Sequence, residues 1–277
     1  MKRSSTEIAR ITLQGDRSEN QDRFTILEEN DSALLVLADG LGGHPRGEVA
    51  AQFLIDTCRE MWNRVRKPLV NPAHFLQQCA QRTHQAIITW GIQQEPPVTP
   101  HTTAVLALLQ EGRCYWGHAG DSRFYLIRKG EIHLISRDHV LANEPQALDP
   151  VVEELHPGII TRCLGGAAQR AGLVLGTPVQ LLEEDIVLLC SDGFWNQLDE
   201  EEMLLTLHNV TPLHNALSTL GEAAKEFSPG QSDNITAVGV RMGSASFGIG
   251  LGPVNHEEDV ELLQAIEHLN KLIERTF

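Results

Sequence analysis

Residues 32–40, Ser32-Ala33-Leu34-Leu35-Val36-Leu37-Ala38-Asp39-Gly40, are almost continuously apolar up to Ala38 and end in an aspartate and a glycine. A run of this length without polar alternation predicts a strand that is buried on both faces. Asp39-Gly40 then marks a turn at the end of the strand. The neighbouring segments of the chain must therefore cover this strand from two sides.

Short strand patterns dominate the chain around this segment, and two helical blocks interrupt them. Strands are expected at residues 8–14, 23–28, 103–109, 113–118, 123–128 and 132–135, with hairpin turns at 110–112 and 129–131. Helices are expected at about 47–66 and 71–92, and Pro72 suits a first helical turn. Antiparallel hairpins with clustered helices predict α+β layers rather than a repeated βαβ unit.

The second half of the chain has a less regular pattern. Residues 137–178 show weak periodicity and predict a mobile or irregular surface segment. A strand at 185–190, helices near 200–208 and 212–227, and a last strand at 235–241 follow.

The C-terminal end differs in composition from the rest of the chain. We expect a domain over residues 1–242, a glycine-rich linker at 243–254 and an amphipathic helix at 255–277. The apolar stripe of that helix predicts packing on its own domain or docking to a partner, and the pattern leaves both open.

The overall charge excludes several classes of partner. The formal net charge is −15, with 22 Lys and Arg against 37 Asp and Glu. This balance argues against a nucleic-acid-binding protein and against electrostatic docking on an anionic membrane. If the protein handles an anion, it needs a local source of positive charge.

The expected location is the cytoplasm. The N-terminal residues lack the apolar stretch of a signal peptide, and the longest apolar runs are too short to cross a bilayer. The five cysteines are scattered and odd in number, which is typical of free thiols rather than of disulfides or a zinc site.

Four aspartates lie where predicted strands begin or end: Asp22, Asp39, Asp192 and Asp233. Any one of them alone is best interpreted as a turn former. Together they can converge at one rim of a layered domain, where carboxylates repel one another unless cations lie between them. Oxygen ligands select Mg²⁺ or Mn²⁺, and two such ions would supply the missing positive charge.

Other catalytic motifs are absent from the sequence. Residues 40–45 invite a dinucleotide-binding interpretation, but Pro45 stands where the third glycine should be. No phosphate-binding loop of the GxxxxGK[ST] type, no GxSxG elbow and no HExxH pair occurs.

The ordered motifs resemble those of the metal-dependent (type 2C, PPM) protein phosphatases, bacterial members above all. The resemblance spans about residues 8–241 and is carried by Arg17-Ser18-Glu19-Asn20-Gln21-Asp22, Asp39-Gly40-Leu41-Gly42-Gly43-His44, Thr102-Thr103-Ala104, Gly120-Asp121-Ser122-Arg123, Ser191-Asp192-Gly193 and Ser232-Asp233-Asn234. It implies a four-layer αββα sandwich, in which two antiparallel sheets are flanked by helices and the metal site lies at one edge.

The resemblance also implies roles for individual residues. Two Mg²⁺ or Mn²⁺ ions would be held by Asp22, Asp39, Asp192, Asp233 and the Gly40 carbonyl, and a water bridging both ions would attack phosphorus in line. Arg17 matches the phosphate-binding arginine. Asp121 matches the position that supports a third, weaker ion.

Two residues depart from the family pattern. Gln21 stands where many members carry Glu, and Leu41 stands where animal members carry a histidine proposed as the general acid. His44 lies three residues further on and does not settle the identity of the proton donor. Residues 137–178 correspond to the variable flap of the family, which shapes the choice of substrate.

The leading hypothesis is a Mg²⁺- or Mn²⁺-dependent hydrolase of phosphoserine and phosphothreonine on proteins, opposing a bacterial Ser/Thr kinase. A catalytically silent scaffold that binds phosphoproteins or partners is the alternative from a different class. All four metal-type aspartates and Arg17 are present, which disfavours the scaffold. A metal-dependent nuclease is a third option, which the acidic balance disfavours.

Overall fold

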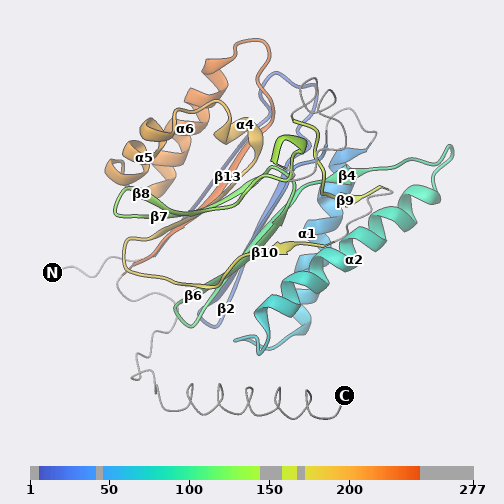
Figure 1. Cartoon of the computed structure of the whole chain (residues 1–277), viewed down its shortest axis with the longest axis horizontal. Coiled ribbons are helices and arrows are strands. Elements are labelled where there is room, and N and C mark those ends of the chain that lie inside the picture. Colours follow the sequence, from blue (N-terminus) through green and yellow to red (C-terminus); the bar gives the residue numbers. More distant parts are fainter. Residues whose placement is uncertain (1–5, 42–45, 144–157, 167–171, 244–277) are drawn as a thin grey trace.

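Two antiparallel β-sheets stack face to face, and helices cover their outer faces (Figure 1). This computed structural model describes residues 6–41, 46–143, 158–166 and 172–243. The four-layer αββα sandwich that the family resemblance implies is confirmed. The predicted linker, apart from Gly243, and the predicted C-terminal helix lie outside the described residues.

In the described residues, the first sheet has five strands in the order β1-β13-β12-β7-β8. Their bounds are β1 Glu7–Leu13, β13 Ile235–Arg241, β12 Ile186–Cys190, β7 Arg123–Arg128 and β8 Glu131–Ile135. The short helix α4 (Asp192–Trp195) and the longer helices α5 (Glu200–Asn209) and α6 (Leu213–Phe227) pack against its outer face.

The part of the chain that the structure describes contributes six strands to the second sheet, with the order β10-β6-β5-β3-β2 and with β11 also paired to β6. Their bounds are β10 Val174–Leu175, β6 Arg113–Ala119, β5 Ala104–Gln110, β3 Ser32–Ala38, β2 Arg23–Glu29 and β11 Val179–Gln180. Helices α1 (Gly47–Arg64) and α2 (Pro72–Ile92) cover its outer face. Asn71 caps α2, because its side-chain oxygen accepts a hydrogen bond from the His74 N–H at 3.0 Å.

Strand β3 is buried on both faces, as its composition predicts. Leu34 and Val36 pack against α1 and α2, whereas Leu35 and Leu37 pack against the facing sheet. Every residue of the strand is buried. An apolar run without alternation is therefore the expected pattern for a strand in the middle of four layers.

The two predicted hairpin turns are confirmed, and their backbone explains their sequences. Glu111 and Gly112 have φ values of 49° and 69°, and Lys129 and Gly130 have 54° and 77°. Two consecutive residues with positive φ are typical of the primed turns that match the twist of antiparallel strands.

Part of the segment 137–178 is more ordered than predicted. Short strands β9 (Leu164–Gly165) and β10 occur within it, β9 pairs with β4 (His101–Thr102), and a 3₁₀ turn spans Leu141–Asn143. Leu164 and Leu173 are buried in the core under α1 and α2. The prediction of an irregular surface segment is wrong here, because two-residue strands are too short to produce a periodic pattern.

All five cysteines are free and buried. Within the described ranges, no helix has both the length and the apolarity needed to cross a bilayer.

Candidate metal centre

The candidate site lies at one edge of the sandwich, where both sheets present aspartates. Asp22 precedes β2 and Asp39 follows its antiparallel neighbour β3. Asp192 follows β12 and Asp233 lies two residues before the neighbouring β13. Because antiparallel neighbours begin and end at the same edge of a sheet, each pair must meet there.

A cavity of about 550 Å³ opens at this edge. It is lined by Arg17, Ser18, Glu19, Gln21, Asp39, Gly40, Leu41, Asp121, Gly158, Ile160, Asp192, Asp233 and Asn234. Asp22 lies deeper and is buried. The structure therefore brings every predicted site residue to one place.

The glycine of each Asp-Gly pair is required by a close approach of backbones. A Cβ atom on Gly40 would lie 2.4 Å from the carbonyl carbon of Gly47, at the start of α1. A Cβ atom on Gly193 would lie 2.2 Å from the carbonyl oxygen of Asn234. The glycines thus allow the loops that carry Asp39 and Asp192 to pack closely at the rim.

Two threonines hold the backbone of Asp39. The Asp39 N–H donates to the Thr103 hydroxyl at 2.9 Å, and the Asp39 carbonyl accepts from the Thr102 hydroxyl at 2.9 Å and the Thr103 N–H at 2.8 Å. Thr103 in turn shares a hydrogen bond of 2.7 Å with Ser122, next to Asp121. These contacts explain why a Thr-Thr pair belongs to the motif set, a role that the sequence alone did not indicate.

Asp22 is held beneath the cavity by the residue that precedes Asp192. The Ser191 hydroxyl donates to Asp22 Oδ2 at 2.9 Å, whereas Asp22 Oδ1 is buried and has no hydrogen-bond partner in the described part of the chain. Burial is the main cause that raises the pKa of Asp22 to about 7, and the negative charge of Asp192 adds to it.

The other carboxylates of the cluster are perturbed in the same direction. Burial raises the pKa of Asp39 well above its ordinary value, and repulsion from Asp22, Asp192, Asp121 and Asp233 raises it further. Burial followed by the charge of Asp192 raises the pKa of Asp121 to about 7. Burial and the charge of Asp233 raise the pKa of Asp192. Without cations, the cluster therefore holds protons at a pH where surface carboxylates are ionised.

We expect the metal-free protein to lose stability as the pH rises from about 4 to about 7. Asp22 binds its proton more tightly in the folded chain, with a pKa of about 7, than in the unfolded chain. Over this range the unfolded chain has released a proton that the folded chain still holds, so the free energy of unfolding falls as the pH rises. The slope is about 1.4 kcal/mol per pH unit for each such proton.

Urea denaturation at several pH values, in the presence of a chelator, measures this slope. The Asp22→Asn variant keeps a side chain of the same shape but cannot titrate, and its slope should be shallower than that of the parent protein. Parallel pH profiles for the two proteins would contradict the expectation.

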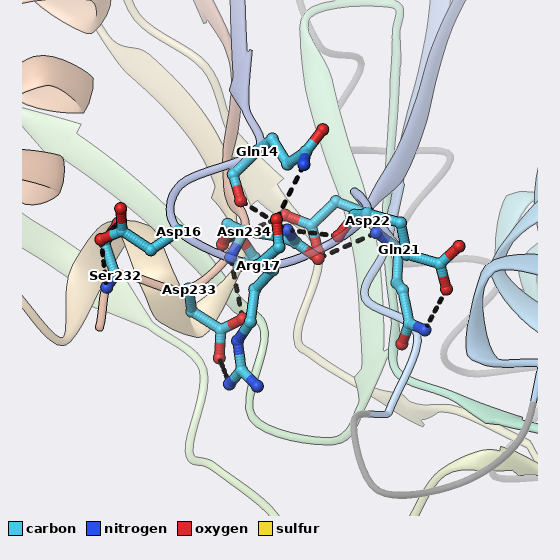
Figure 2. Close-up of polar contacts among 10 residues, drawn as sticks. Gln14, Asp16, Arg17, Gln21, Asp22, Ser232, Asp233 and Asn234 are labelled. Carbon is cyan, nitrogen blue, oxygen red and sulfur yellow. Dashed lines mark hydrogen bonds and ion pairs between the residues drawn. The ribbon is translucent and has the colours of Figure 1, made fainter. Parts of the chain in front are cut away.

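The loop that carries Arg17 is tied to the segment before β13 (Figure 2). The Asn234 amide donates to the carbonyl oxygens of Gln14 at 2.8 Å and Glu19 at 3.0 Å, and its oxygen accepts from the Gln21 N–H at 2.8 Å. Asp16 accepts hydrogen bonds from the backbone and hydroxyl of Ser232 at 3.0 and 2.8 Å. Sequence reasoning missed these positioning roles, although the Ser232-Asp233-Asn234 motif was a signal for them.

Arg17 itself lies at the rim of the cavity. Its Nη2 atom contacts Asp233 Oδ2 at 2.6 Å, and 55% of its side chain is exposed (Figure 2). The hydrogen bond to Asp233 and the charge of that carboxylate raise the pKa of Arg17. A guanidinium that remains this accessible can still turn toward an anion in the cavity.

The donor set fits hydrated divalent cations. The orphaned Asp22 Oδ1 and the mutual repulsion of the buried carboxylates both call for positive charge. In the described ranges, no three Asp, Glu, His or Cys side chains gather closely enough to surround one ion by themselves. Mg²⁺ keeps several waters and binds through one or two carboxylates, so this spacing suits two hydrated ions better than one closed site.

Two residues that differ from the family pattern, Gln21 and Leu41, both line the cavity. Gln21 donates its amide hydrogen to Glu19 Oε1 at 2.8 Å, which keeps a carboxylate at this wall. His44 lies outside the described residues.

Comparisons with a family model and with known proteins agree with one another. Residues 14–226 match the family model described as protein phosphatase 2C. The protein phosphatase PhpP of Streptococcus pneumoniae is 31% identical, and the alignment covers 85% of this chain and 97% of PhpP.

Solved structures are similar over the same region. A serine/threonine phosphatase of S. agalactiae has a TM-score of 0.74 and 29% identity, with 85% of this chain and 98% of the other covered. The catalytic domain of PstP in complex with two manganese ions has a TM-score of 0.68 and 28% identity, with 85% and 97% covered.

Proposed function

Because this chain belongs to the protein phosphatase 2C family, we propose that its carboxylate-lined cavity holds two divalent cations, Mg²⁺ or Mn²⁺, in the service of phosphate-ester hydrolysis. The chain is a serine/threonine protein phosphatase of the bacterial type. The single observation that carries the proposal is the state of the buried Asp22 carboxylate. One of its oxygens has no hydrogen-bond partner among the described residues, and it lies among four further aspartates whose negative charges repel one another.

In this proposal Asp22, Asp39, Asp192, Asp233 and the Gly40 carbonyl hold the two ions. When bound, the ions would offset negative charge on the phosphoryl oxygens and make a water molecule acidic enough to act as a nucleophile. Asp39 has the central place, since four other aspartates act on its pKa and Thr102 and Thr103 fix its backbone.

Arg17 supplies the phosphate contact. Its planar guanidinium suits two oxygens of a phosphate monoester, and the contacts of Asn234 and Ser232 hold its loop at the rim. Asp233 binds the same guanidinium in the structure, so cation binding at Asp233 would leave Arg17 available to the substrate. Leu41, which lines the cavity, has no ionisable group. We therefore assign protonation of the leaving serine or threonine oxygen to a water that a bound ion would make acidic.

Finer aspects of the function belong to the same proposal. The substrate is a protein phosphorylated by a Ser/Thr kinase, and Asp121 supports a third, weaker ion. The five free thiols favour a cytoplasmic location. Docking of the predicted C-terminal helix to a partner stays a prediction, as does its separation from the domain by a linker.

Counting bound ions tests the proposal. In a titration followed by the EPR signal of free Mn²⁺, the full-length protein should bind at least two ions. The Asp233→Asn variant should bind one of them at least about tenfold more weakly, because a ligand is lost. Asp31→Asn is the control, since Asp31 lies in the turn at the opposite end of the β2–β3 hairpin. Fewer than two ions in the parent protein, or unchanged binding in Asp233→Asn, would contradict the proposal.

A further inference from the structure

Arg123, at the start of β7, joins three elements around the candidate metal centre. Its Nε and Nη2 atoms donate to both oxygens of Asp138 at 2.9 and 2.8 Å, and its Nη1 atom donates to the Tyr125 hydroxyl at 3.1 Å. Its guanidinium carbon lies 3.2 Å from the centroid of the Trp195 ring. The side chains of Arg123 and Asp138 are only 21% and 11% exposed, so these contacts are largely shielded from water.

Two of these partners, Trp195 and Asp138, lead to the turn that carries Asp121. The Trp195 indole N–H donates to the carbonyl oxygen of Asp121 at 3.0 Å. His139, the residue after Asp138, binds the backbone of Gly120 twice: its N–H donates to the Gly120 carbonyl at 3.0 Å, and its Nδ1 accepts from the Gly120 N–H at 3.2 Å. The backbone of the turn is therefore held from two sides.

The Asp121 carboxylate depends on this backbone for its orientation. Asp121 lines the cavity, and none of the described side chains donates a hydrogen bond to its carboxylate. Gly120 has a φ of 107°, and a Cβ atom there would lie 2.7 Å from the side chain of Thr103. Only glycine adopts this conformation readily. The turn is held by the Ser122–Thr103 hydrogen bond and by the backbone contacts of Trp195 and His139.

We propose that Arg123 is a positioning residue for Asp121: by stacking on Trp195 and clamping Asp138, it keeps the Asp121 carboxylate directed at the cation bound most weakly in the cavity. The inference rests on the proposed function, because it takes Asp121 as a cation ligand. The new element is that two contacts of Arg123 set the orientation of the Asp121 carboxylate: its cation–π stack on Trp195 and its two-pronged ion pair with Asp138.

The opposite end of β7 offers a matched control. Arg128 makes the same two-pronged contact, donating to the two oxygens of Asp185 at 2.8 and 2.7 Å, away from the cavity. Arg128→Lys and Arg123→Lys therefore break equivalent two-pronged ion pairs on the same strand, but only the ion pair of Arg123 lies beside Asp121. A third variant, Trp195→Phe, keeps an aromatic face for Arg123 and removes the hydrogen bond to Asp121.

The test is a Mn²⁺ titration of the full-length protein and these variants, followed by EPR, with the Mn²⁺ and phosphopeptide dependence of turnover measured in parallel. Arg123→Lys and Trp195→Phe should weaken the weakest Mn²⁺ site by about tenfold and leave the tighter sites within about twofold. Their apparent KM for Mn²⁺ should rise while the KM for the phosphopeptide stays unchanged. Arg128→Lys should behave as the parent protein in both measurements.

Three outcomes would overturn the proposal. The first is a weakest-site affinity in Trp195→Phe and Arg123→Lys equal to that in Arg128→Lys. The second is a loss of all Mn²⁺ sites together in Arg123→Lys, which would indicate general disruption. The third is that the parent protein reaches full activity with two bound ions and that Asp121→Asn changes neither its Mn²⁺ binding nor its activity. Asp121 would then not be a cation ligand, but phosphate-ester hydrolysis by a two-ion centre would still stand. Failure of the proposed function would differ, because the parent protein itself would then bind no Mn²⁺ pair.

Discussion

Removal of divalent cations should abolish the release of phosphate from a phosphothreonine peptide, and added Mn²⁺ should restore it. We expect the rate to fall by at least about 10³-fold, or about 4 kcal/mol in the activation free energy, since cations of this kind contribute several kcal/mol to charge stabilisation. The protein cannot compensate from its own charges. Its formal net charge is −15, and among the described residues that line the cavity only Arg17 carries a positive charge.

The measurement compares turnover in Mn²⁺, in EDTA, and in EDTA followed by excess Mn²⁺. Recovery in the third case separates loss of the cation from irreversible damage by the chelator. Equal turnover in all three conditions would contradict the binuclear proposal.

Replacement of Asp39 by asparagine should have a comparably large effect. The substitution preserves the shape of the side chain but removes a charged oxygen from the centre of the cluster, where a cation loses a ligand. We expect turnover at saturating Mn²⁺ to fall by at least about 10³-fold. The hydrogen bonds of Thr102 and Thr103 go to the backbone of Asp39, so they remain in the variant.

The same substitution should stabilise the metal-free protein. Burial and four neighbouring carboxylates disfavour the ionised form of Asp39, and a neutral asparagine avoids that cost. In the presence of EDTA, Asp39→Asn should therefore unfold at a higher urea concentration than the parent protein. Opposite changes in activity and stability would show that the residue is retained for cation binding. Lower stability together with lower activity would instead indicate a structural role.

Asp31→Asn is the control for this experiment as well. Asp31 is exposed in the turn that joins β2 and β3. Both variants therefore change the same hairpin, but only Asp39→Asn changes the carboxylate cluster. We expect it to keep the activity of the parent protein. A loss of activity in this variant would mean that the hairpin, rather than the charge of Asp39, limits turnover.

Much of the fold was predictable because local patterns agree with the tertiary arrangement. The apolar run at 32–38, the primed turns at 111–112 and 129–130, and the Asn71-Pro72 start of α2 each have a local physical cause. The segment 137–178 was predicted poorly, because its strands have two residues each and gain their order from pairing with β4 and β6.

The candidate site was also predictable only in part from the sequence. The sequence by itself identified which aspartates lie at strand ends, and the order of the motifs indicated the family and the carboxylate set. It did not indicate that Asn234 ties down the loop of Arg17, or that Trp195 and Arg123 support the turn of Asp121. Those contacts join residues from distant parts of the chain, and no spacing in the sequence encodes them.

Residue type and local pattern thus determined the elements, the turns and the chemistry that the site can perform. Only the tertiary structure decided that Asp22 would be buried with an unpaired oxygen and that Arg17 would contact Asp233. The physical reason is that burial and charge repulsion depend on distances between strands of two facing sheets. The pairing registers of those strands and the stacking of the sheets set these distances, and both exist only in the folded chain.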